Sequence, residues 1–204
     1  IKNNSTYDDA LHIIYCKDIS IESLEIKKAF GDAVDIDMSQ KIFLKDLKIS
    51  DSKNDAVDLM ESSVFLINSV LTGSDDKAIS VGENSYLVIK DSKIKNNNIG
   101  IATKDGSFSN IENLSFENNN FHINNYKKNW RYGDGGITVI YESNFNKLNR
   151  MSKSFDSNQK PLEIDNFSSL IINNSKIGNE IINQELYSEI NKLKHTKKLE
   201  LLIK

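Results

Sequence analysis

The hydrophobic pattern of this chain repeats at an almost fixed interval. A short phrase, in which Ala or Gly precedes an apolar residue, recurs with its small residue at positions 10, 33, 56, 78 and 100. A short period that is kept over five copies is typical of a solenoid, in which each repeat contacts only its neighbours. The period also predicts which residues stack on one another.

Within a copy, apolar and polar residues alternate, which is the period-two pattern of a β-strand. In one copy Val34 and Ile36 flank Asp35, and two more short apolar segments follow at residues 42–44 and 47–49. Asn, Asp, Gly and Ser separate the segments, and these residues suit tight corners. A leucine-rich αβ unit is less favoured, because no segment within a copy has helical spacing. The sequence predicts an all-β coil of parallel strands in which one copy of the repeat forms one coil.

The repeat defines one predicted β-helix domain over residues 1–180. Two interruptions are expected inside it, a loop excursion near residues 125–136 and an irregular polar stretch at 147–161. The remaining residues, 181–204, are predicted to form a C-terminal helix or cap.

That terminal prediction rests on helical spacing of Ile182, Leu186, Ile190 and Leu193, which favours an amphipathic helix over residues 181–197. Such a helix would cover the open end of the solenoid. The alternative is a partner-binding helix that joins copies of the chain into a homo-oligomer.

Composition excludes several classes. The net charge of −3 gives no electrostatic basis for nucleic-acid binding, and no apolar run reaches the ~18 residues of a membrane-spanning helix. Cys16 is the only cysteine, so neither an intrachain disulfide nor a Cys-rich metal site is expected. The chain starts at Ile1, which suggests a mature protein or one part of a larger chain with other domains.

Stacking predicts one acidic face. If Val34 and its counterparts point inward, an outward column runs through His12, Asp35, Asp58, Ser80 and Ala102, and a neighbouring column ends at Lys104. Glu61, Glu83 and Asp105 stack at the following turn.

Adjacent carboxylates on a parallel ladder repel, so a cation, a lysine or a shared proton should offset the repulsion. Lys77, Lys104 or a Ca²⁺ ion at Asp35 and Asp58 are the candidates. Three roles stay open for this face: structural corner residues, ligand or ion binding, and catalysis. Catalysis would use Lys104 as a base together with Asp35, Asp58 and Glu83.

The loop excursion is the second candidate site. Its ligand-binding candidates combine aromatic rings with cationic groups, a mixture that suits anionic sugars: Tyr126, Lys127, Trp130, Arg131 and Tyr132. The alternative is that the aromatic rings pack against the side of the coil. The three histidines show no metal-ligand spacing and are interpreted as structural or solvated: His12, His122 and His195.

Three segments carry a resemblance to a known family. Residues 54–58 read Asn-Asp-Ala-Val-Asp, residues 75–83 read Asp-Asp-Lys-Ala-Ile-Ser-Val-Gly-Glu, and residues 99–107 read Ile-Gly-Ile-Ala-Thr-Lys-Asp-Gly-Ser. This series resembles the right-handed parallel β-helix repeats of pectate-lyase-like proteins, above all bacterial surface or envelope proteins, some of which carry spore-coat-kinase-like (CotH-type) modules. The resemblance covers about residues 8–178.

The resemblance implies a single-stranded right-handed parallel β-helix, polysaccharide as a partner, and an extracellular, cell-surface or periplasmic location. No catalytic signature of the family is matched, since both arginines, Arg131 and Arg150, lie outside the regular coils. The leading hypothesis is a module that binds or presents polysaccharide. The alternatives are a polysaccharide lyase or hydrolase, and a structural or adhesion stalk.

Overall fold

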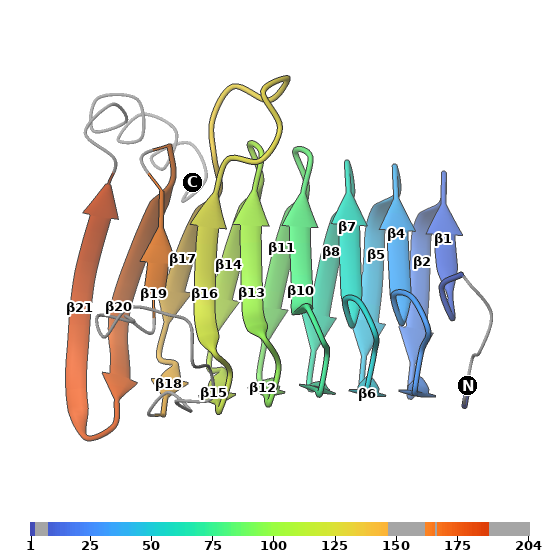
Figure 1. The fold of residues 1–204 in the computed structure, drawn as a ribbon, viewed down its shortest axis with the longest axis horizontal. Coiled ribbons are helices and arrows are strands. Elements are labelled where there is room, and N and C mark those ends of the chain that lie inside the picture. Colours follow the sequence, from blue (N-terminus) through green and yellow to red (C-terminus); the bar gives the residue numbers. More distant parts are fainter. Residues whose placement is uncertain (3–7, 147–161, 166, 188–204) are drawn as a thin grey trace.

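A computed structural model describes residues 1–2, 8–146, 162–165 and 167–187 of the chain. The strands wind into a flattened coil, each turn of which lies beside the next along the long axis of the molecule (Figure 1). One side of the coil is a seven-stranded parallel sheet with the order β1-β4-β7-β10-β13-β16-β19. Its strands are β1 (His12–Ile14), β4 (Val34–Asp37), β7 (Val57–Met60), β10 (Lys77–Gly82), β13 (Ile99–Lys104), β16 (Phe121–Tyr126) and β19 (Leu162–Ile164).

A longer sheet forms the other two sides of the coil. One side holds β2 (Lys17–Glu22), β5 (Gln40–Lys45), β8 (Ser63–Ile67), β11 (Tyr86–Lys90), β14 (Phe108–Glu112), β17 (Ile137–Tyr141) and β20 (Ser169–Ile177). The other side holds β3 (Glu25–Lys27), β6 (Lys48–Ser50), β9 (Val70–Thr72), β12 (Lys93–Lys95), β15 (Ser115–Glu117) and β18 (Asn144–Phe145). The strand β20 pairs with both β17 and β18 and so joins the two sides.

The predicted alternation is present in the strands. In β4, Val34 and Ile36 are fully buried while Asp35 and Asp37 point outward and are partly exposed. Each inward side chain stacks on its counterpart in the next coil, as Ile36 does on Leu59. Full burial of such a side chain stabilises the fold by roughly 1.5–3 kcal/mol. The core is therefore one continuous stack that no single coil provides alone.

One corner of the coil uses left-handed backbone without glycine. Asp46, Asn68, Asp91 and Asn113 have φ angles of 55°, 54°, 49° and 53°. Asn68 donates its side-chain N–H to Asp46, and Asn113 donates to Asp91 Oδ1 at 2.7 Å. These side chains, about one period apart, form a ladder along the corner, and the alternation of Asn with Asp places a donor beside each of these two carboxylates.

A second corner is held by serine hydroxyl groups. The Ser62 Oγ accepts the N–H of Ser39 at 2.9 Å and donates to the carbonyl of Met60 at 2.8 Å. The Ser62 N–H in turn donates to Ser85 Oγ at 3.1 Å. This ladder satisfies backbone N–H groups that face the interior and have no strand partner.

The C-terminal end differs from the sequence prediction. Residues 181–187, expected to begin a capping helix, belong to the strand β21 (Glu180–Tyr187), which pairs antiparallel with β20. Gly178, at φ 60°, forms the tight turn between them. The unpaired backbone edge of β20 needs partners, and a strand supplies them where a helix does not. The rest of the predicted helix, 188–197, lies outside the described residues.

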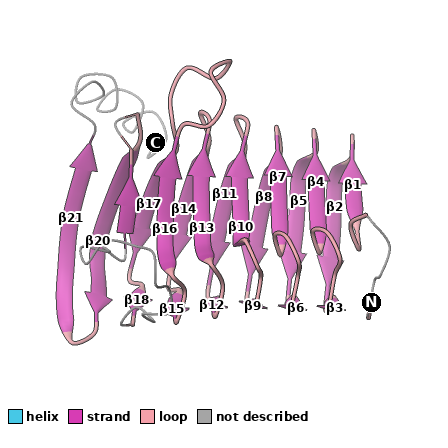
Figure 2. Cartoon of the chain, in the orientation of Figure 1, coloured by secondary structure: helices cyan, strands magenta, loops and turns pink. Residues whose placement is uncertain are grey.

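The described part of the chain contains only strands, turns and loops (Figure 2). Within those same residues, no helix has the length and hydropathy needed to span a bilayer. The predicted irregular stretch at 147–161 lies outside the described residues.

We expect Ser62→Ala to lower the free energy of unfolding by about 1–3 kcal/mol, because the buried N–H of Ser39 loses its acceptor. Urea unfolding monitored by circular dichroism measures the change. Ser20→Ala, at an exposed strand position, is the matched control and should change stability by less than about 0.5 kcal/mol. Equal effects of both substitutions would contradict a role for the serine ladder.

Candidate functional site

An aspartate ladder borders the seven-stranded sheet. Asp9 Oδ1 accepts the N–H of Asp32 at 2.8 Å, and Asp32 Oδ1 accepts the N–H of Asp55 at 2.6 Å. The ladder ends at Lys77, whose N–H donates to Asp55 Oδ1 at 2.8 Å. Asp9, Asp32 and Asp55 therefore serve as turn residues whose carboxylates accept backbone N–H groups of the next coil.

Lys77 also places a cation at the end of this ladder. Its Nζ lies 3.3 Å from Asp55 Oδ1 and donates a hydrogen bond to Asp76. Lys77 is 8% exposed, and although burial lowers its pKa, Asp55 and Asp76 outweigh that effect and raise it. Lys77 is thus the offsetting lysine that the stacked carboxylates require.

The predicted outward column is confirmed by the strand register. His12 pairs with Asp35, Asp35 with Asp58, Asp58 with Ser80, and Ser80 with Ala102. These side chains stand on five neighbouring strands of one sheet. The alternation and the period of the repeat were sufficient to place them.

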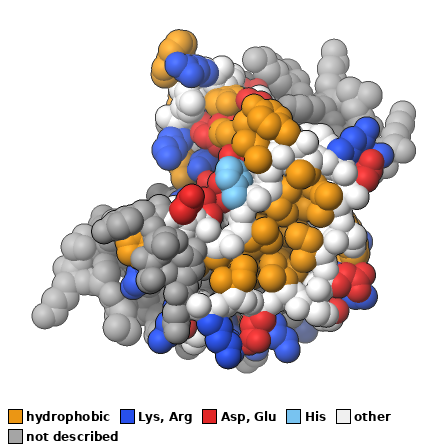
Figure 3. Space-filling view, turned by 90° about the vertical axis from the view of Figure 1, so that its right-hand side faces the viewer, with side chains coloured by type: hydrophobic (Ala, Val, Ile, Leu, Met, Phe, Trp, Pro, Cys, Tyr) orange, Lys and Arg blue, Asp and Glu red, His pale blue; other side chains and the backbone are white. Residues whose placement is uncertain are grey.

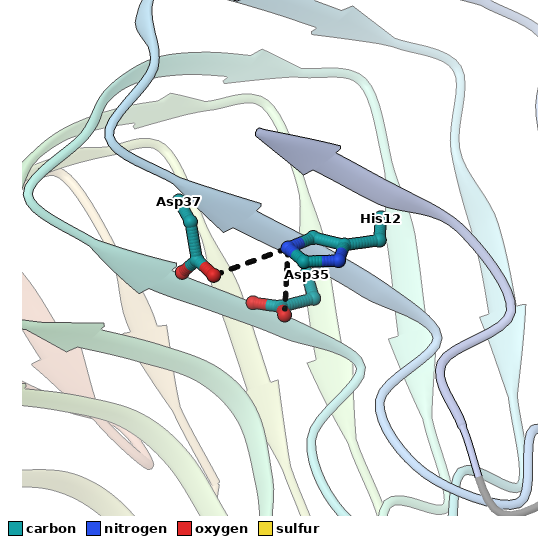
Figure 4. A group of neighbouring side chains, drawn as sticks. All are labelled: His12, Asp35 and Asp37. Atoms are coloured by element: carbon teal, nitrogen blue, oxygen red, sulfur yellow. Dashed lines mark hydrogen bonds and ion pairs between the residues drawn. The ribbon is translucent and has the colours of Figure 1, made fainter. Parts of the chain in front are cut away.

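Within the column, the side chain of Asp35 contacts His12. His12 Nε2 lies 3.4 Å from Asp35 Oδ2 and 3.1 Å from Asp37 Oδ2 (Figure 4). Burial raises the pKa of Asp35 to about 7, the charge of Asp37 adds to the rise, and His12 opposes it. Burial lowers the pKa of His12, but the hydrogen bond to Asp37 and the nearby carboxylates raise it overall. Sequence reasoning set His12 aside, although the period of the repeat pointed to this contact.

Asp58 has a local partner of its own. Its Oδ1 accepts the N–H of Leu59 at 3.0 Å, a bond within its own strand. Asp58 is partly buried and stacks between Asp35 and Ser80. This geometry fits the structural role considered for it.

Lys104 lies against the surface of the coil and is only 6% exposed. Its stem crosses Gly82, where an added Cβ would lie 2.5 Å from Lys104 Cε. Burial raises the pKa of Glu83, and Lys104 partly offsets that rise. The glycine in the outward column therefore makes the room that lets Lys104 lie flat beside Glu83.

The four predicted catalytic residues do not form one cluster. Lys104 and Glu83 interact, and the charge of Asp58 acts on Glu83. Asp35 stands on β4, three strands from Lys104 on β13, which is about 14 Å at the spacing of a β-ladder. Because Lys104 is buried and lies this far from Asp35, the four residues do not share one centre at which a lyase reaction could take place.

The loop excursion is anchored by a buried aspartate. Asp105 is fully buried, and its Oδ1 accepts the N–H groups of Lys128 and Asn129, each at 2.7 Å. At the other end of the loop, Gly106 donates its N–H to the carbonyl of Gly135 at 3.1 Å. The loop thus rises from the tip of β16 with both ends held (Figure 1).

The loop also reaches back across the coil. The Tyr132 hydroxyl donates to Glu61 Oε1 at 3.3 Å, a contact between positions far apart in the sequence. Lys127 donates from Nζ to the carbonyl of Gly133 at 2.8 Å and closes the loop on itself. These bonds bring the predicted binding loop next to the Glu61–Glu83–Asp105 turn.

The predicted ligand-binding residues divide into two groups. Tyr126 belongs to β16 and is partly buried. Lys127 is bonded to Gly133 within the loop, and Tyr132 is bonded to Glu61 on the coil. Trp130 is 83% exposed, and the Arg131 guanidinium lies 5.9 Å from its ring centroid. Trp130 and Arg131 are therefore the members of the set that face solvent.

Sequence reasoning missed an aromatic stripe on the opposite sheet. Phe43 and Phe65 stack with centroids 5.3 Å apart, and Tyr86 and Phe108 stack at 5.2 Å. Three of these rings, Phe43, Phe65 and Tyr86, line a shallow groove of about 320 Å³. The signal was present, because the two members of each pair are separated by one period of the repeat.

A sequence profile described as "Right handed beta helix region" matches residues 1–177. Two solved structures of the surface adhesin PfbA of Streptococcus pneumoniae are similar to this chain. The first has a TM-score of 0.60 and 15% sequence identity, and the match covers 81% of this chain and 49% of the adhesin chain. The second has a TM-score of 0.57 and 15% sequence identity, and the match covers 82% of this chain and 55% of the adhesin chain. The chain spans about half the length of these structures. No curated protein matches its sequence.

We expect Asp32→Asn to stabilise the fold at pH 8, because burial raises the Asp32 pKa to about 6. An unfolded aspartate has a pKa of about 3.9, so between that pH and about 6 the folded chain holds a proton that the unfolded chain has lost, and stability falls as the pH rises. Asparagine retains the oxygen that accepts the N–H of Asp55 without the charge.

Urea unfolding at pH 4 and pH 8 measures this effect. The variant should be more stable than the parent at pH 8 and nearly equal to it at pH 4. Asp18→Asn, at an exposed carboxylate of β2, is the control and should show no such difference. A variant that is less stable than the parent at pH 8 would contradict a destabilising charge on Asp32.

Proposed function

The chain belongs to the right-handed β-helix family, and on that basis we propose that it is a cell-surface binding module that attaches to anionic polysaccharide through the loop at residues 127–136. The name surface adhesin, which is printed for the PfbA structures, supports a surface location and an adhesive role. Polysaccharide as the ligand rests on the chemistry of the loop itself.

The observation that carries the proposal is the exposure of Trp130. A tryptophan that is 83% exposed keeps a large apolar ring in water, which disfavours the free protein and rewards a partner that covers the ring. A flat aromatic face stacks on the apolar face of a sugar ring. Trp130 is therefore the proposed contact residue.

Charge at the loop selects the class of polysaccharide. Lys127, Lys128 and Arg131 flank Trp130, against one acidic residue, Asp134. Arg131 and Lys128 are exposed, so their cationic groups are accessible to a ligand. A guanidinium binds a carboxylate through two parallel hydrogen bonds. Polymers that contain uronic acids are the proposed ligands.

The anchoring of the loop supports binding of a defined ligand. Asp105 and Gly106 hold the two ends of the loop, and Tyr132 ties it to Glu61. A loop that is ordered before binding loses less conformational entropy when the ligand arrives. The rigid coil thus presents Trp130 at a fixed place.

The aromatic stripe is a second candidate surface for the same function. Its groove exposes the rings of Phe43 and Phe65 between Lys41 and Val88. The stripe has fewer cationic groups than the loop, so it would favour neutral sugar chains. One substitution in each surface, tested for its effect on polysaccharide binding, shows which surface binds.

We expect Trp130→Ala to weaken binding to polygalacturonate about tenfold or more, since loss of one buried aromatic contact costs ~1.4 kcal/mol or more. Affinity electrophoresis in gels with and without the polymer measures retardation. Tyr15→Ala removes another highly exposed aromatic residue, 74% exposed, and is the matched control that should leave retardation unchanged.

Dextran in the gel tests the charge requirement, and it should retard the parent less than polygalacturonate does. If Phe65→Ala abolishes retardation while Trp130→Ala does not, the aromatic stripe is the binding surface and the loop is not. A parent protein that no uronate polymer retards would refute the proposed ligand.

A further inference from the structure

Two strands at the N-terminal end of the coil bring together three metal-ligating side chains. His12 comes from β1, and Asp35 and Asp37 come from β4 (Figure 4). One ligand atom from each residue can lie within 4.8 Å of the other two. The parallel register pairs His12 with Asp35 directly, so the backbone fixes two of the three donors.

The donor separations match those around a small divalent ion. His12 Nε2 lies 3.1 Å from Asp37 Oδ2 and 3.4 Å from Asp35 Oδ2. Zinc binds imidazole nitrogen and carboxylate oxygen at about 2.0–2.2 Å, so two of its ligands lie about 2.9 Å apart at an octahedral angle and about 3.4 Å apart at a tetrahedral angle. Since all three donor atoms lie within 4.8 Å of one another, small side-chain rotations would bring them into contact with a single ion.

The surroundings add negative charge without blocking access. Asp9 and Asp58 act on Asp35 through their charges, so the site is strongly acidic. The His12 side chain is 41% exposed, while those of Asp35 and Asp37 are 16% and 17% exposed. Viewed from the N-terminal end, a histidine lies beside acidic side chains at the surface (Figure 3). The carboxylates are therefore held in place, and an ion can reach them from solvent.

We propose that His12, Asp35 and Asp37 bind one divalent transition-metal ion of the zinc class. Three protein ligands leave a further position for water or for a donor group of a partner. The imidazole distinguishes this site from the Ca²⁺ site that the sequence suggested at Asp35 and Asp58, because calcium prefers six to eight oxygen ligands. The site lies on a different part of the coil from the Trp130 loop and does not depend on polysaccharide binding.

Titration calorimetry with ZnCl₂, after treatment of the full chain with a chelator, tests the proposal. One saturable site is expected in the parent. His12→Gln and Asp37→Asn should each weaken zinc binding at least tenfold, and CaCl₂ should not compete at equal concentration. Asp18→Asn, at an exposed carboxylate outside the cluster, is the control and should leave the affinity unchanged.

A second measurement, made on the parent protein, tests the site even if the variants fail to fold. Zinc should shift the Nε2 resonance of a single imidazole in ¹⁵N nuclear magnetic resonance spectra. His122 should stay unshifted, because it is buried and its Nδ1 and Nε2 lie 3.2 and 3.0 Å from Asn119 and Asn146. No saturable zinc binding, undiminished binding in folded His12→Gln, or equal affinity for calcium would each overturn the proposal.

Discussion

The hydrogen-bonded stacking of identical positions one coil apart constrains everything else in this molecule. Every residue in a regular coil has a neighbour of the same orientation one period away along the chain, at the ~4.8 Å spacing of a parallel ladder. For apolar residues this spacing builds the core. For acidic residues it creates repulsion, and each acidic column relieves that repulsion differently: Asp55 with Lys77, Asp91 with Asn113, and Asp35 with His12.

This constraint explains how much could be predicted. The strands, their register, the outward column and the turn ladder follow from the period alone, because a parallel coil leaves no freedom in which residues become neighbours. The same reasoning placed His12 beside Asp35, but the histidine was interpreted as structural or solvated because its own spacing, rather than the period, was used to judge it. The stacking of Phe43 on Phe65 was missed although it follows from the same period.

The remaining features depend on contacts that a period does not encode. Helical spacing at residues 182–193 was outweighed, up to Tyr187, by the need of β20 for an edge partner. Lys104 was expected to be an accessible base, and its burial depends on the empty space above Gly82. The fixing of the loop by Asp105 joins residues on successive coils through backbone N–H groups, and side-chain patterns do not report such bonds.

The loop also shows that a corner of this coil accommodates inserted residues. Ser109 pairs in register with Leu87 on one side and with Thr138 on the other. The segment from Ser109 to Thr138 contains the loop and is longer than the segment from Leu87 to Ser109, and yet both pairs stack normally. The additional residues leave the β-ladder at one corner, and the chain rejoins the ladder in register, so that the following strand keeps the same faces inward and outward. The proposed binding surface and the residues that stabilise the coil therefore lie in separate stretches of the sequence. The loop can therefore be replaced, in evolution or by protein engineering, while the coil that carries it stays unchanged.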